Sequence, residues 1–326
     1  MSAGRDELGA HVSIAGGVAL APSRGRELGC GAIQIFVKNQ RQWAAPPLTA
    51  AEAAAFRRGR RRAGLRHAFA HGSYLVNLAC PDPAAWRQAV DTFTDELRRA
   101  ARLGLDALVI HPGSHRGAGV EPGLDAIARA IDEALRATGR SSVKIALENT
   151  AGAGHVLGRT FSELRAILER LGHPRRLGVC IDTCHLFVAG YDIRTPAGYA
   201  LAMTECADLI GTGRVLAFHL NDAKAPLGSG LDRHEHIGRG FLGLRPVPAA
   251  AQRSPVRPRA EGARDAEGAG PHRRSAKSGD AAPTARAGHR AEVTPTRRHS
   301  ALTGHVEQRG EIGVQMFCPN ATRRSL

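Results

Sequence analysis

The stretch Leu177 to Ile193, LGVCIDTCHLFVAGYDI, joins an apolar run to two groups that are costly to bury. The run Leu-Gly-Val-Cys-Ile leads directly to Asp182, and His185 follows three residues later. A carboxylate and an imidazole beside a buried strand lose hydration unless they are paired or coordinate a metal. The stretch therefore predicts a strand whose carboxyl end carries a functional site.

The same arrangement recurs along the first 245 residues. Six further apolar runs alternate with longer amphipathic stretches: LGAHVSI, AIQIFV, HAFAHGS, ALVIHPG, KIALENT and VLAFHLND. The stretches 83–104 and 161–172 have helical spacing, the second with Thr160 or Ser162 as N-cap and Gly172 as its stop. Alternating strands and helices predict parallel strands with crossover helices. Seven such units favour an α/β fold of the TIM (β/α)8-barrel type over a doubly wound sheet.

Polar side chains end nearly every apolar run. They are His11 and Ser13, Lys38, His71, His111, Glu148 and Asn149, Asp182, and His219 with Asn221. In a parallel barrel these strand ends gather at one mouth, where active sites lie. A single buried histidine is usually a satisfied core residue. Four strands that end in histidine indicate a shared ligand instead.

Composition narrows the class of protein. The chain is 43% hydrophobic, enough for a large core, and it has no apolar run of about 18 residues that would span a membrane. The N-terminus lacks the apolar core of a secretory signal, and the six cysteines are scattered, so a cytoplasmic location is predicted. Cys180 and Cys184 lack the spacing of thiolate zinc sites and are predicted to be small buried residues.

The formal net charge of +15 favours a polyanionic partner, nucleic acid above all. This inference is discounted, because Arg and Ala dominate throughout and a coding bias would produce the same composition. After Arg245 the apolar periodicity disappears, and Arg, Ala, Pro and Gly dominate. We predict a barrel domain over 1–245 and a tail over 246–326 that is disordered or arises from a disrupted reading frame. In the second case the eighth βα unit is missing. A basic tail that contacts nucleic acid is the alternative.

Eight imidazoles and carboxylates are candidate metal ligands: His71, His111, Glu148, Asp182, His185, His219, Asp232 and His234. A set without thiolates suits catalytic zinc or manganese with open coordination positions. Eight ligands exceed what one tetrahedral ion uses, so more than one ion is expected. Clustered ions suit the hydrolysis of phosphate esters.

Eight segments, in order from about Leu8 to Leu244, closely resemble the endonuclease IV family of AP endonucleases. They are GAHVSIAGG, QIFVKNQRQW, HGSYLVNLA, VIHPGSH, ALENTAG, CIDTCHLFVAGYD, FHLNDAK and DRHEHIGRG. The resemblance implies a monomeric TIM barrel with three Zn²⁺ ions, Mn²⁺ being an alternative in one position. It also implies hydrolysis of duplex DNA on the 5′ side of abasic sites, which leaves 3′-hydroxyl and 5′-deoxyribose phosphate ends.

The resemblance also implies roles for the candidate ligands. His71 and His111 would bind the first ion, Asp182 and His219 the second, and Glu148 would bridge the two. His185, Asp232 and His234 would bind the third. Glu148, His111 and Asp182 are the expected catalytic residues, and His11 is expected to orient ligands rather than to bind metal.

DNA contacts are expected from loops at the mouth. The resemblance implies that Arg41 and Tyr74 wedge into the duplex while the abasic nucleotide is extruded. Trp43 either joins them or packs against the fold. The arginine-rich stretch 57–62, RRGRRR, is expected to be a solvated helix face rather than a DNA-binding element.

The family has a ninth ligand, a glutamate at the end of the eighth strand, and this sequence has no secure match. Glu261 is a weak candidate because its approach is rich in arginine and proline. Two alternatives therefore remain open: a sugar isomerase or epimerase on a similar metal-bearing barrel, and a DNA-binding remnant without activity.

Overall fold

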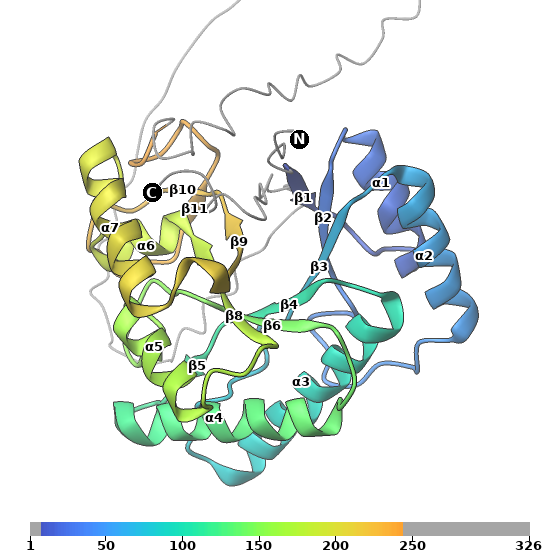
Figure 1. Ribbon diagram of the computed structural model, residues 1–326, viewed down its shortest axis with the longest axis horizontal. Coiled ribbons are helices and arrows are strands. Elements are labelled where there is room, and N and C mark those ends of the chain that lie inside the picture. Colours follow the sequence, from blue (N-terminus) through green and yellow to red (C-terminus); the bar gives the residue numbers. More distant parts are fainter. Residues whose placement is uncertain (1–7, 244–326) are drawn as a thin grey trace, which may run out of the picture. The chain divides into compact units, whose positions relative to one another are not determined.

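The computed structural model describes residues 8–243, and these form a parallel sheet with helices along it (Figure 1). The predicted tail over 246–326, the missing eighth unit and Glu261 all lie outside the described residues. Seven strands pair in chain order, each parallel to the next: β1 (Gly9–His11), β2 (Ala32–Phe36), β3 (His67–His71), β4 (Ala107–Ile110), β6 (Lys144–Glu148), β8 (Leu177–Asp182) and β9 (Val215–His219). These are the seven predicted strands, and their order confirms the TIM-barrel fold class for the first seven units.

The crossover helices follow the predicted pattern. They are α1 (Ala21–Glu27), α2 (Ala50–Ala63), α3 (Pro83–Leu103), α4 (Val120–Ala137), α5 (Phe161–Arg170), α6 (Thr183–Ala189) and α7 (Pro196–Leu209). The Asp82 side chain caps the start of α3, and Gly104 ends that helix in the left-handed conformation that glycine tolerates. Thr160 is the N-cap of α5, as expected, and that helix ends just before Leu171 and Gly172. None of the helices in residues 8–243 is long and apolar enough to cross a membrane.

Two short antiparallel pairs lie outside the main sheet. β5 (Gly113–Ser114) pairs with β7 (Val156–Leu157), and β10 (Asp222–Ala223) pairs with β11 (His234–Glu235). The Asp222 carboxylate accepts hydrogen bonds from five backbone N–H groups, four of them in the segment 238–243. It thereby fixes the chain that follows β11, and β11 in turn carries His234.

The arginines of 57–62 lie on α2, and all except Arg60 are exposed, as expected of a solvated face. Arg60 instead pairs with Asp106, at a distance of 3.0 Å between Nη2 and Oδ2. Asp106 immediately precedes β4, so this ion pair lies at the amino-terminal end of the sheet.

The inner face of the sheet explains where the functional residues lie. A small cluster of buried residues, separate from the main core, comprises Ala32, Phe69, Ala107, Val109, Ala146, Cys180 and Ala217. Because side chains alternate between the two faces of a strand, the residues two positions further along point the same way. Those positions hold polar side chains: Gln34, His71, His111, Glu148, Asp182 and His219. The apolar inner layer is therefore followed, toward the carboxyl ends, by a layer of polar side chains.

Candidate metal centre

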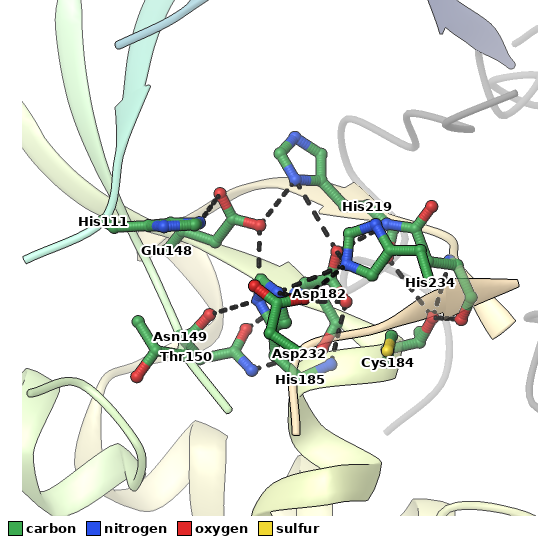
Figure 2. Close-up of polar contacts among 12 residues, drawn as sticks. His111, Glu148, Asn149, Thr150, Asp182, Cys184, His185, His219, Asp232 and His234 are labelled. Atoms are coloured by element: carbon green, nitrogen blue, oxygen red, sulfur yellow. Dashed lines mark hydrogen bonds and ion pairs between the residues drawn. The ribbon is translucent and has the colours of Figure 1, made fainter. Parts of the chain in front are cut away.

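The carboxylate of Glu148, at the end of β6, lies at the centre of this polar layer and is 1% exposed. Its Oε2 atom is 3.1 Å from Nε2 of His71 and 3.2 Å from Nε2 of His111. Its Oε1 atom is 2.8 Å from Nδ1 of His219 and 3.6 Å from Nδ1 of His185. Figure 2 shows His111 and His219 on different sides of the carboxylate. The two oxygens therefore face different imidazoles, as a carboxylate that bridges two cations would.

The charge of Glu148 is held in place by these neighbours. Burial acts to raise its pKa, but the imidazoles of His219 and His111 outweigh burial and hold the pKa well below its ordinary value. A buried carboxylate that stays ionised needs positive charge beside it. Divalent cations bound by the same imidazoles would supply that charge.

Three imidazoles have an acceptor beside each ring nitrogen. Nδ1 of His71 is 2.8 Å from the carbonyl oxygen of Gly72, while its Nε2 faces Glu148. Nδ1 of His185 is 2.8 Å from the carbonyl oxygen of Asn149, and its Nε2 is 3.2 Å from Oδ1 of Asp232.

His219 completes the pattern, because its Nε2 is 3.1 Å from Oε1 of Gln34 while its Nδ1 faces Glu148. A neutral imidazole has only one N–H to donate. When the N–H of such a ring donates to the outer acceptor, the nitrogen that faces the carboxylate needs a second proton or a metal ion. This is the arrangement in which an outer acceptor fixes the tautomer of a metal-binding histidine.

A second group of donors forms a near-equilateral triangle. Oδ1 of Asp232 is 3.2 Å from Nε2 of His185 and 3.2 Å from Nε2 of His234, and the two nitrogens are 3.3 Å apart. Ligand atoms about 2.0 Å from a tetrahedral zinc ion are separated by about 3.3 Å. The triangle therefore fits three ligands of one tetrahedral ion and leaves the fourth position open.

Nearby carboxylates raise the pKa values of both histidines in this triangle. Burial acts to lower the pKa of His185, but Asp182 and Asp232 outweigh it and raise the pKa to about 10. Burial also acts to lower the pKa of His234, but the charges of Asp182 and Asp232 outweigh it and raise that pKa. Both shifts favour the charged imidazole over the neutral one, and a metal bound at the same nitrogens would take the place of the proton.

Asp182, at the end of β8, is fully buried and held on both carboxylate oxygens. Oδ2 accepts a hydrogen bond of 2.6 Å from Asn221, and Oδ1 accepts one of 2.9 Å from the backbone N–H of His185. Oδ2 also lies 4.0 Å from Nδ1 of His219 and 3.8 Å from Nε2 of His234. Asp182 thus lies between the group around Glu148 and the triangle.

The structure brings all eight predicted ligands together. The sets whose donor atoms lie within 4.8 Å of one another include His71 with Glu148 and His219, His111 with Glu148 and His185, and His185 with Asp232 and His234. A fourth set joins Asp182 and His234 with Cys184, so Glu148, His185 and His234 each belong to two sets. The eight residues can hold metal ions, and their donors suit zinc or manganese.

Cys184 also approaches this centre, next to Asp182 and His234. Burial raises the pKa of its thiol, and Sγ lies 3.7 Å from the carbonyl oxygen of Arg233. A buried thiol that stays protonated is a poor metal ligand. Cys180 and Cys184 are both buried, as predicted.

Gln34 was missed by sequence reasoning. It is fully buried on β2, where Oε1 faces His219 and Nε2 is 3.3 Å from Nδ1 of His11. His11 lies beside His71, with ring centroids 6.4 Å apart, and its orienting role stays a prediction. The sequence did contain a signal for Gln34. Side chains on a strand alternate between its two faces, and Gln34 lies two residues after Ala32, which is on the inner face.

The residues expected to contact DNA lie at the same end of the sheet. The Tyr74 side chain is 66% exposed, and its ring packs against His71 and His111 at centroid distances of 5.6 Å and 6.2 Å. Arg41 is exposed on the segment after β2, and Trp43 is partly exposed. Contact with DNA stays a prediction for all three.

Comparisons with known proteins agree with this geometry. The family model described as xylose isomerase-like TIM barrel matches residues 23–256. A protein of Geobacter sulfurreducens named probable endonuclease 4 is 47% identical over 241 residues, which cover 74% of this chain and 81% of that protein. A protein of Chloroflexus aurantiacus with the same name is 46% identical over 236 residues, which cover 72% of this chain and 83% of that protein.

Two solved structures are similar to this chain in fold. The crystal structure of endonuclease IV from Thermus thermophilus superposes with a TM-score of 0.67 at 36% identity, covering 74% of this chain and 88% of that one. A D-tagatose 3-epimerase-like protein has a TM-score of 0.56 at 21% identity, covering 71% and 81%. The second likeness shows a shared fold alone.

Proposed function

The chain belongs to the endonuclease IV family of xylose isomerase-like TIM barrels, and from that premise we propose that it is a zinc-dependent AP endonuclease. As a member of this family it is an endonuclease that acts on DNA. Its proposed substrate is duplex DNA with an abasic site, cut on the 5′ side to leave 3′-hydroxyl and 5′-deoxyribose phosphate ends. One observation carries the proposal: imidazoles with acceptors beside both nitrogens surround a buried carboxylate.

The proposed ligands divide into three sets, two of which share Glu148. His71 and His111 would hold one ion with Oε2 of Glu148, and His219 and Asp182 a second with Oε1. The triangle of His185, Asp232 and His234 would hold the third. Clustered divalent ions lower the pKa of bound water and stabilise charge on the attacking and leaving oxygens of a phosphodiester. The eight proposed ligands of one chain complete the site without a second subunit, and the proposed enzyme is a monomer.

The chain's own residues orient this site. Gln34, Asn149 and Gly72 each accept from the outer nitrogen of a proposed ligand, so that its other nitrogen faces a carboxylate. Asn221 keeps Asp182 in place between the sets. Arg41 and Tyr74 would contact the duplex at the mouth. Extruding an abasic nucleotide costs little, because there is no base to unstack.

Cleavage of a defined duplex tests this proposal. The zinc-loaded protein is expected to cut a duplex with one abasic-site analogue on its 5′ side, and a polymerase should extend the new 3′ end. Removal of the metal with a chelator, verified by elemental analysis, should lower the rate by at least about 100-fold, and added zinc should restore it.

Three other outcomes would contradict the proposal. Full activity in protein that elemental analysis shows to be free of metal would remove the metal from the mechanism. Binding of abasic and intact duplex alike, without cutting, would favour an inactive DNA-binding remnant. Turnover of a free ketose with no cutting of DNA would favour an epimerase.

A further inference from the structure

The segment 39–46, between β2 and α2, is held by side chains on other parts of the fold. Ser73, which follows β3, donates from Oγ to the carbonyl oxygen of Gln40 at 2.6 Å. Arg99 of α3 donates from Nη2 to two further carbonyl oxygens of the segment, those of Ala45 and Pro46, at 3.1 Å and 2.8 Å. The backbone of this segment is therefore fixed by polar groups from outside it.

Lys38 holds the same segment from a buried position. Its Nζ donates to the carbonyl oxygen of Trp43 at 2.6 Å and lies 3.8 Å from Oε1 of Glu96 on α3. The two side chains are 2% and 1% exposed. Oε2 of Glu96 accepts a hydrogen bond of 3.2 Å from the backbone N–H of Ser73. Glu96 thus connects the segment after β2 to the turn after β3. We call Lys38, Ser73, Glu96 and Arg99 the clamp.

Stability does not explain the buried pair. Burial raises the pKa of Glu96 to about 7, against the attraction of Lys38 and the hydrogen bond from Ser73. The protein interior therefore disfavours the charged form of Glu96 relative to water. Replacing a buried ion pair by apolar side chains of similar size often leaves stability unchanged or raises it. The pair is better explained by what it holds in place.

The two loop segments that the clamp joins carry Arg41 and Tyr74. The hydrogen bond from Ser73 to Gln40 links the residues that immediately precede them. Tyr74 is 66% exposed, and in residues 8–243 the guanidinium of Arg41 makes neither a hydrogen bond nor an ion pair. The backbone beneath both side chains is therefore fixed, while Arg41 is exposed and the Tyr74 ring keeps an exposed side beyond its contacts with His71 and His111.

We propose that the clamp residues are positioning residues, which hold Arg41 and Tyr74 in one relative arrangement suited to a duplex at an abasic site. The inference rests on the proposed function. A segment already fixed in its binding arrangement loses less conformational entropy when the duplex binds. The clamp acts on recognition, so its loss should appear in KM rather than in kcat.

The double substitution Lys38→Met with Glu96→Met removes both charges and keeps the volume. It also removes the partners of the Trp43 carbonyl oxygen and the Ser73 N–H, so circular dichroism and metal content are measured first. We expect KM for the abasic duplex to rise about tenfold, with kcat and metal content unchanged within about twofold. Glu96→Gln, which keeps a carbonyl for the Ser73 N–H, should act in the same direction and is the second test if the double variant does not fold. Arg60→Met is the matched control, because it removes an ion pair and hydrogen bonds to three carbonyl oxygens at the opposite end of the sheet, and it should leave KM and kcat within about twofold of the wild type.

A double-mutant cycle with Arg41→Ala separates positioning from general damage. If the clamp acts through Arg41, combining Arg41→Ala with Glu96→Gln should raise KM hardly more than Arg41→Ala alone. Additive effects, an unchanged KM, or a loss of metal in Glu96→Gln would overturn the inference. A wild-type protein that does not cut the abasic duplex would instead refute the proposed function, so the two failures are distinguishable.

Discussion

Substituting Glu148→Gln is expected to lower kcat/KM for abasic duplex by at least about 10⁴-fold. The two charged oxygens of Glu148 face different imidazoles at distances of 2.8 to 3.2 Å, and glutamine offers only one neutral oxygen. The amide nitrogen would face imidazoles that must bind cations. The variant should therefore also bind fewer metal ions per chain, which elemental analysis measures beside the rate.

A matched substitution controls for the loss of charge. Glu133→Gln alters a glutamate of α4 that pairs with Arg87 at the surface, so its activity and metal content should equal those of the wild type. If Glu148→Gln kept its activity within about tenfold and its full metal content, a bridging role for this carboxylate would be wrong.

Two histidines on one strand provide the second large effect. His71 lies at the carboxyl end of β3 and faces Glu148, whereas His67 lies at the other end, with Nδ1 3.3 Å from Oδ2 of Asp106. We expect His71→Ala to lower kcat/KM by about 10³-fold and to reduce metal content, because one ligand of a shared site is lost.

His67→Ala should leave both quantities within about twofold of the wild type, at most with a small loss of stability from the broken contact with Asp106. Steady-state rates and metal analysis on both variants check this. Equal losses in the two variants would mean that His71 acts on the fold and not on the site.

The alternation of side chains along strands made much of this centre predictable. A histidine or carboxylate two residues beyond a small inner residue, as in Ala146 followed by Glu148, marks the layer next to the mouth. The seven strands and the Thr160 cap followed from local patterns, because they depend on near neighbours in the sequence.

Contacts between distant segments could not be predicted in this way. Gln34 stands in the apolar run AIQIFV as a single amide, and its contact with His219 joins residues 185 positions apart. The pairing of Lys38 with Glu96 depends on how α3 packs, which no local pattern specifies. The division of ligands among three ions came from the family resemblance, not from spacing.

The central claim is that imidazoles and carboxylates from separate strands and loops hold a cluster of divalent cations. Anomalous diffraction at the zinc absorption edge, from crystals of zinc-loaded protein, tests it most directly. We expect peaks on each side of the Glu148 carboxylate and a further peak among His185, Asp232 and His234. A well-folded protein that shows no anomalous peak at either place after exposure to excess zinc would contradict it.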